Sequence, residues 1–216
     1  MKTLTKEMQE SITPTIALHL MQEGNKRFVN NLKVNRNLLQ QANETSDAQH
    51  PFAIILSCID SRTSVELIFD QGLGDVFSVR IAGTIINEDI LGSMEFACKV
   101  AGAKIIVVLG HSKCGAIKGA CDNVEMGSLT ALLSKIQPAV AAEKTIIENR
   151  TSSNEEFVEK VNTINIRRTV HAVMERSPIL KGLIETGECG IIGGYHDITT
   201  GKVSFYQDTK FGFETD

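Results

Sequence analysis

Two short runs of consecutive apolar residues constrain the fold of this chain more than any other feature. The first, Phe52–Leu56, follows Pro51, and the second is Ile105–Leu109. Such runs are typical of strands buried on both faces of a parallel sheet, because a strand with one face in water alternates apolar and polar residues. Parallel strands need crossover connections, which are usually helices. We therefore expect an α/β fold with a central, mostly parallel β-sheet flanked by helices.

Capping residues and hydrophobic periodicity predict most of the remaining elements. Thr13 and Pro14 predict the start of a helix that continues over Ile16–Val29, since threonine is a good N-cap and proline a good first helical residue. Asn87 predicts the cap of a helix that runs to about Val100. We further expect a polar loop over Asn37–Gln49, a helix through Val65–Phe69 that stops at Gly72 or Gly74, strands over Val76–Val79, Gly190–Tyr195 and Val203–Tyr206, a helix starting near Cys114 and mostly helical structure over Leu129–Glu175.

Length and composition narrow the class of protein. With 216 residues, 42% of them hydrophobic, the chain is expected to form a single domain over residues 1–216, with a helical arm over about residues 1–48. The formal charge is -4 and no basic block stands out, so nucleic acid is not an expected partner. No run has the length of a signal peptide or a membrane span, which predicts a cytoplasmic protein with no membrane partner.

Two polar clusters follow the two apolar runs directly. They read Cys58-Ile59-Asp60-Ser61-Arg62 and His111-Ser112-Lys113-Cys114. Both clusters stand at carboxyl ends of expected strands, where open α/β sheets bind their ligands. Together they offer two thiolates, an imidazole and the carboxylate of Asp60, which is a full tetrahedral set for Zn²⁺. The sequence therefore predicts a catalytic zinc site from Cys58, Asp60, His111 and Cys114.

Each of these residues also has an ordinary interpretation when taken alone. A single cysteine at a strand end is usually a small buried apolar residue, and Asp60 with Arg62 could be a simple salt bridge. The joint arrangement favours the metal site, because ligands of the right number and type converge on one place. The three other cysteines are expected to be reduced core residues without a function, and they are Cys98, Cys121 and Cys189.

With both motifs intact, the sequence resembles the β-class carbonic anhydrases, which carry C-x-D-x-R after the first strand and H-x-x-C after the third. The likeness extends from about Leu18 to Gln207. It includes Glu23–Phe28, Gln49-His50-Pro51, Gly74–Gly83 and Gly194–Asp197 followed by Thr200-Gly201. The resemblance implies an antiparallel strand at the C-terminal edge of the sheet. It also implies an N-terminal helix packed on a partner subunit, in a homodimer or homotetramer.

The resemblance further implies a lyase, carbonate dehydratase, that hydrates CO₂ reversibly to bicarbonate and a proton by attack of a zinc-bound hydroxide. Asp60 then has two alternative positions. It either ligates zinc and closes the site, or is held by Arg62 and accepts a hydrogen bond from the hydroxide. Gln49 matches the family glutamine that donates a hydrogen bond to the substrate oxygen.

Two other functions stay open at this point. The first is a hydrolase of CS₂ or COS, because such enzymes resemble this family and keep the same metal ligands. The second is a noncatalytic binding protein with a structural zinc. Structural sites normally close all four positions with cysteine and histidine, so the presence of Asp60 and Arg62 speaks against it.

Overall fold

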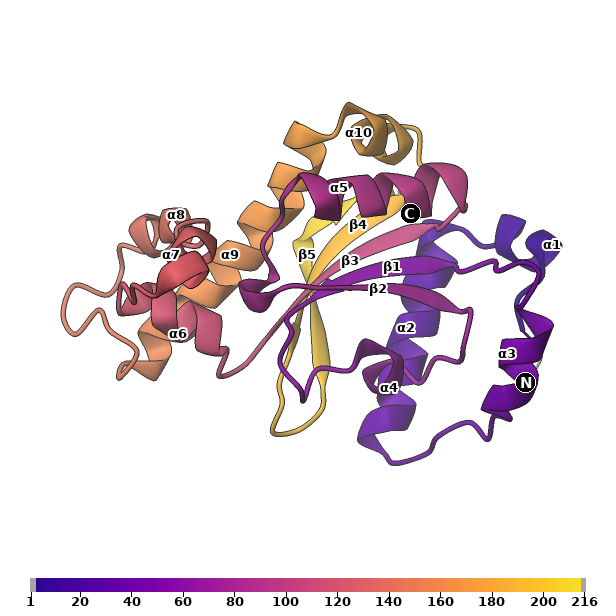
Figure 1. Ribbon diagram of the computed structural model, residues 1–216, viewed down its shortest axis with the longest axis horizontal. Helices are drawn as coiled ribbons and strands as arrows, with labels where there is room; N and C mark the ends of the chain where they lie inside the picture. The colour runs from indigo at the N-terminus through magenta and orange to yellow at the C-terminus, as the bar shows by residue number, and fades with distance from the viewer. Residues whose placement is uncertain (1–2, 215–216) are drawn as a thin grey trace.

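The computed structural model describes residues 3–214, which contain a five-stranded sheet in the order β2-β1-β3-β4-β5. Strands β2, β1, β3 and β4 pair in parallel, and β5 pairs antiparallel with β4 at the edge (Figure 1). The strands are β1 Ala53–Ser57, β2 Val76–Arg80, β3 Ile105–His111, β4 Gly190–His196 and β5 Val203–Phe211. The α/β fold with an antiparallel C-terminal edge strand is thus confirmed.

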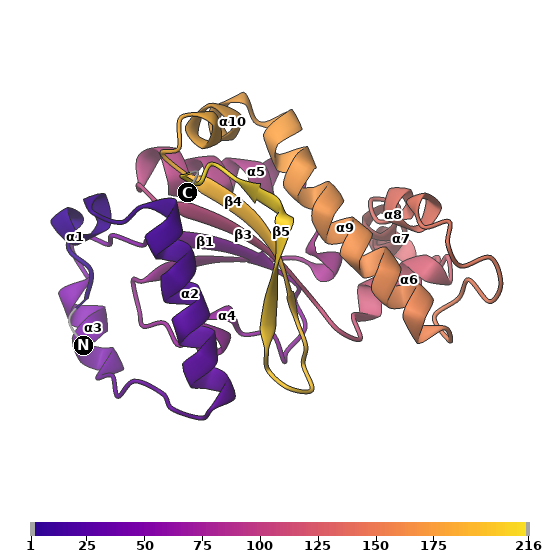
Figure 2. The ribbon, with the colours of Figure 1, turned by 180° about the vertical axis from the view of Figure 1, so that it is seen from behind.

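Helices cover both faces of this sheet (Figures 1 and 2). They are α1 Lys6–Glu10, α2 Pro14–Val29, α3 Leu38–Glu44, α4 Val65–Ile68, the 3₁₀ helix η1 Ala82–Thr84, α5 Glu88–Glu95, the π-helix η2 Phe96–Val100, α6 Gly115–Cys121, α7 Gly127–Leu133, α8 Gln137–Ala142, α9 Glu155–Arg176 and α10 Pro178–Glu185. Apolar residues of α5, α9 and α10 pack on one face, and those of α2 and α4 on the other. Within residues 3–214 no helix has both the length and the apolar composition that crossing a bilayer demands.

The position of strand β1 between two layers of helices explains why its sequence is a continuous apolar run. Ile54 and Leu56 belong to the buried cluster under α5, α9 and α10, whereas Ala53 and Ile55 belong to the cluster under α2 and α4. Successive side chains of a strand point to opposite faces, so burial on both sides requires an apolar residue at every position. The same alternation holds in β3. The site at the carboxyl ends of β1 and β3 is therefore supported by two packed layers.

Several predicted elements match the structure closely, and others differ from it. Helix α2 begins at Pro14 with Thr13 as its N-cap and ends at Val29, as predicted. The loop expected over Asn37–Gln49 is wrong in part, because Leu38–Glu44 form helix α3. Asn37 caps α3, with its side chain accepting a hydrogen bond from the Gln40 amide at 3.1 Å.

Other differences concern where two helices end and the presence of one helix that was not predicted. Helix α4 ends at Ile68, well before the glycines expected to stop it. The helix predicted to run from Asn87 to Val100 is divided into α5 and the π-helix η2. Helix α10 was not expected, and it begins at Pro178 with the Ser177 hydroxyl accepting a hydrogen bond from the Leu180 amide at 3.2 Å.

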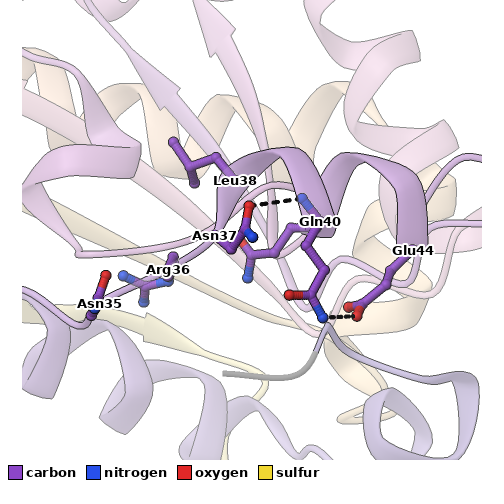
Figure 3. Close-up of a pocket in the computed structure, with 7 residues that line it drawn as sticks. Asn35, Arg36, Asn37, Leu38, Gln40 and Glu44 are labelled. Carbon is purple, nitrogen blue, oxygen red and sulfur yellow. Dashed lines mark hydrogen bonds between the residues drawn. The ribbon is translucent and has the colours of Figure 1, made fainter.

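The predicted arm corresponds to α1, α2 and α3, apart from residues 1 and 2, which lie outside the described residues. Ala17, Leu18 and Met21 of α2 join the buried cluster of β1 and β3. Helix α3 instead borders a hollow of about 780 Å³ (Figure 3), where Gln40 donates a hydrogen bond to Glu44 at 2.8 Å. Helix α3 lies toward the end of the sheet at which β1 begins (Figure 1), whereas Cys58 follows the other end of that strand.

Candidate metal centre

The first thiol of the candidate centre comes directly after the buried strand β1. Cys58 follows Ser57 and is itself buried. Its backbone carbonyl accepts hydrogen bonds from Arg80 Nε at 3.0 Å and from Thr63 Oγ1 at 3.3 Å. Arg80 is the last residue of β2 and also donates to the Asp60 carbonyl at 2.6 Å. The loop that carries Cys58 and Asp60 is therefore tied to the neighbouring strand.

The imidazole and the second thiol come from the end of β3 and the turn that follows it. His111 is the last residue of β3, and Cys114 is the N-cap of α6. The His111 Nδ1 lies 2.9 Å from the Ser112 carbonyl, so a proton on Nδ1 donates to that oxygen. This hydrogen bond fixes the ring and leaves the lone pair of Nε2 available as a ligand.

The three side chains converge on one place. One ligand atom each from Cys58, His111 and Cys114 lies within 4.8 Å of the others, and the two sulfur atoms are 3.9 Å apart. A tetrahedral zinc with metal–sulfur bonds of about 2.3 Å needs a sulfur–sulfur separation of roughly 3.8 Å. His111 Nε2 is buried and has no hydrogen-bond partner among residues 3–214. Spacing, donor types and the unpartnered nitrogen all fit a zinc ion.

The surroundings of the two sulfurs are apolar. Both thiols belong to a buried cluster with Ile85, Ile117 and Ile136. The neighbouring Cys114 thiol, 3.9 Å away, is the main cause that lowers the pKa of Cys58 to about 4, although burial opposes this shift. The same contact, together with burial, raises the pKa of Cys114. The contact thus lowers the pKa of one thiol and raises that of the other, and metal binding requires both as thiolates.

Asp60 lies beside this centre and is held by Arg62. Arg62 Nε donates to one carboxylate oxygen at 2.9 Å and Nη2 to the other at 2.8 Å, while the Arg62 amide donates at 3.0 Å. These bonds from Arg62 hold the pKa of Asp60 well below its usual range, so the carboxylate is ionised. Of the two positions considered for Asp60, the structure contains the one bound to Arg62. Its role as a zinc ligand stays a prediction.

Gln49 is not brought to the three ligands within one chain. It is an exposed residue of the loop before β1, whereas Cys58 follows the other end of that strand. The five residues of β1 span about 16 Å at about 3.3 Å per residue, which is more than a glutamine side chain can reach. The predicted role of Gln49 therefore depends on the site of another copy of the chain.

Sequence reasoning assigned no role to a second histidine next to the centre. His196 ends β4 and pairs in register with His111 of β3, so both side chains point to the same face of the sheet. Burial first, and the nearby His111 second, lower the pKa of His196 to about 4, so its ring is neutral at neutral pH. Neither ring nitrogen has a hydrogen-bond partner in the described part of the chain. The sequence signals for His196 were its place at the end of a predicted strand and within the Gly194–Asp197 run of the family resemblance.

The three remaining cysteines are buried, as expected. Cys98 and Cys189 lie in the cluster under α5, α9 and α10, and Cys121 lies in the cluster of the two ligand thiols. All five cysteines of the chain are free thiols.

Comparison with known proteins agrees with this geometry. A family model described as carbonic anhydrase matches residues 53–203. Carbonic anhydrase 2 of Mycobacterium tuberculosis is 33% identical over 201 residues, covering 88% of this chain and 91% of that protein. The structure of the β-carbonic anhydrase CcaA superposes with a TM-score of 0.70 at 25% identity, covering 88% of this chain and 95% of that one. A structure from a study of two tetrameric β-carbonic anhydrases of Sordaria macrospora has a TM-score of 0.66 at 22% identity, covering 78% and 90%.

Proposed function

The chain belongs to the β-class carbonic anhydrases, and from this membership we propose that it hydrates CO₂ reversibly to bicarbonate and a proton at a zinc ion held by Cys58, His111 and Cys114. The observation that carries the proposal is the convergence of two thiols and one unpartnered imidazole nitrogen, from the ends of two neighbouring parallel strands. Zinc bound there supplies a Lewis acid that activates water for attack on the carbon of CO₂.

The residues of the chain contribute position and charge. Two thiolates and a neutral imidazole fill three positions of a tetrahedral site and cancel the charge of the ion. Asp60 is kept from the fourth position because Arg62 engages both of its oxygens. The ionised Asp60 then accepts a hydrogen bond from the attacking water and orients its lone pair toward CO₂. A structural zinc protein would have no use for this arrangement.

The test is stopped-flow CO₂ hydration with a pH indicator, on protein whose zinc content has been measured. We expect activity in the zinc-loaded wild type and its loss in the Cys114→Ser and Asp60→Asn variants. Zinc-loaded wild type without hydration at any pH from neutral to alkaline would refute the proposal. A parallel assay for sulfide release from COS and CS₂ separates this function from that of a sulfur-analogue hydrolase.

We propose that copies of the chain associate, as a dimer or a tetramer, and that Gln49 acts in the site of the partner subunit. Three large apolar side chains lie exposed around a hollow of about 510 Å³ between α3 and α4, namely Leu38, Leu67 and Leu73. Exposed apolar patches of this kind are typical of interaction sites. The tetrameric relatives and the distance of Gln49 from its own Cys58 support the same proposal.

We propose that residues 1–216 form one domain and that the protein acts in the cytoplasm. The packing of Ala17, Leu18 and Met21 against β1 and β3 supports the first point, because the arm shares a core with the sheet. Five free thiols support the second, since reduced cysteines are typical of the cytosol. Limited proteolysis, which should release no stable arm, tests the first point, and cell fractionation tests the second.

A further inference from the structure

The turn between the two ligands His111 and Cys114 contains a residue in an unfavourable backbone conformation. Lys113 has a φ of +57°, in the left-handed region that costs a residue with a side chain roughly 1–2 kcal/mol. Lys113 lies in the turn between His111, the last residue of β3, and Cys114, the N-cap of α6. A turn of this kind persists only when its surroundings hold it.

Glu159 of α9 holds this turn. Its Oε1 accepts a hydrogen bond from the Lys113 amide at 3.2 Å, and its Oε2 accepts one from the hydroxyl of Tyr195 on β4. The carboxylate is thus fixed at both oxygens, one on the turn and one on the sheet. Glu159 and Lys113 are 46 residues apart in the sequence, so no local sequence pattern predicts this contact.

The same face of α9 also holds the first ligand. Asn162, three residues after Glu159, is buried and donates from Nδ2 to the His111 carbonyl at 2.7 Å. Residues three apart lie on one side of a helix. Helix α9 therefore contacts the backbone at both His111 and Lys113, within the segment that separates the two ligands His111 and Cys114.

We infer that Glu159 is a positioning residue for the metal centre. By holding the Lys113 turn it fixes the separation of the Cys114 and His111 ligand atoms, and through that separation the affinity for zinc. Residues that hold metal ligands in position through hydrogen bonds typically lower metal affinity by about 10–100-fold when they are removed. The inference rests on the proposed function for the identity of the ion, but it concerns metal binding and not the reaction with CO₂.

The test compares three full-length variants in zinc competition with a chromophoric chelator. Glu159→Ala removes the acceptor and should weaken zinc binding about 10–100-fold. Glu159→Gln keeps an oxygen acceptor for the Lys113 amide and should stay within about threefold of wild type. Glu156→Ala is the matched control on the same helix, since Glu156 is exposed and pairs only with Lys160 among the ion pairs of residues 3–214. It should bind zinc like wild type.

Two further measurements separate positioning from a general loss of structure. In the cobalt-substituted proteins, the thiolate charge-transfer bands should change in Glu159→Ala and be unchanged in Glu159→Gln. If Glu159→Ala fails to fold, Tyr195→Phe replaces it, because it releases one oxygen of the same carboxylate and should weaken zinc binding severalfold. Affinity within threefold of wild type in the alanine variant, or equal weakening in the alanine and glutamine variants, overturns the inference. Because zinc affinity is measured without CO₂, a lack of hydratase activity would refute the proposed function and leave this result unaffected.

Discussion

Asp60 and Arg62 form a two-point ion pair, in which Nε and Nη2 of the guanidinium meet different carboxylate oxygens at 2.9 and 2.8 Å. The two residues stand two positions apart in the loop that begins at Cys58. Such paired hydrogen bonds give orientation as well as attraction. Arg62 is exposed, so we expect its ion pair to add little to stability, and its role is to hold Asp60 in position.

Arg62→Ala should therefore lower CO₂ hydration at least 10-fold while the zinc content stays at one per chain, because Asp60 loses its orientation and is free to approach the ion. Asp60→Asn should lower the rate of CO₂ hydration roughly 100-fold, which is within the range expected when general acid–base catalysis is lost. The double variant should be no slower than Asp60→Asn, since Arg62 acts through Asp60. A double variant much slower than both would assign Arg62 a separate role.

Cys114→Ser should abolish stoichiometric zinc binding, because a serine hydroxyl replaces one of two thiolates. Wild type should be stabilised by about 2.7 kcal/mol when free zinc is 100 times its Kd, and the variant should not be. Calorimetry with and without zinc measures this difference. The matched control is Cys121→Ser, a buried thiol of the same apolar cluster, which should lose stability but keep its zinc.

Two inactive variants should restore activity when their subunits are mixed. If Gln49 serves the partner's site, a dimer of one Gln49→Ala chain and one Asp60→Asn chain contains one intact site and one doubly altered site. Random mixing gives half mixed dimers, so about a quarter of wild-type activity should return after unfolding and refolding together. Unmixed variants treated in the same way are the control. No recovery, with mixed dimers confirmed by mass spectrometry, would place Gln49 outside the partner's site.

Asp70 should make folding sensitive to acid. Burial alone would raise its pKa, but hydrogen bonds from Arg27 and Arg36 outweigh burial and hold the pKa below its ordinary value near 3.8. A carboxyl with a lowered pKa stabilises the folded state fully above its unfolded pKa, and this contribution is lost as pH falls through the folded value. Asp70→Asn should cost about 3 kcal/mol at pH 7 and clearly less near pH 3. Urea unfolding at both pH values checks this; an equal loss at both would show that ionisation of Asp70 is not the cause.

The sheet and the ligands were predictable because their signals are local. The apolar run of β1 and the cap formed by Thr13 and Pro14 each specify an element from adjacent residues. Helix α3 was missed because it has seven residues, and its leucines Leu38 and Leu39 are exposed, so it lacks an apolar face toward the core. Helix α10 has a local start signal in Ser177 and Pro178, an N-cap followed by a proline at the first helical position.

The supporting residues of the site could not be found in this way. Cys58, His111 and Cys114 were identified because two motifs follow two predicted strands. Glu159 contacts Lys113, which is 46 positions away in the sequence. His196 pairs in register with His111, which is 85 positions away. Such contacts depend on how α9 and β4 pack on the sheet, which no periodicity specifies. Only the folded chain brings these residues together.

The apolar cluster that contains the sulfurs of Cys58 and Cys114 also forms the core beneath α6, α7, α8 and the start of α9. An ion that joins the two sulfurs therefore joins the carboxyl end of the interior strand β1 to a layer of helices built from a different stretch of the chain. We therefore expect maturation of the newly synthesised protein to depend on metal supply in the cell, since the proposed ion would both complete the packing and prepare the enzyme for turnover.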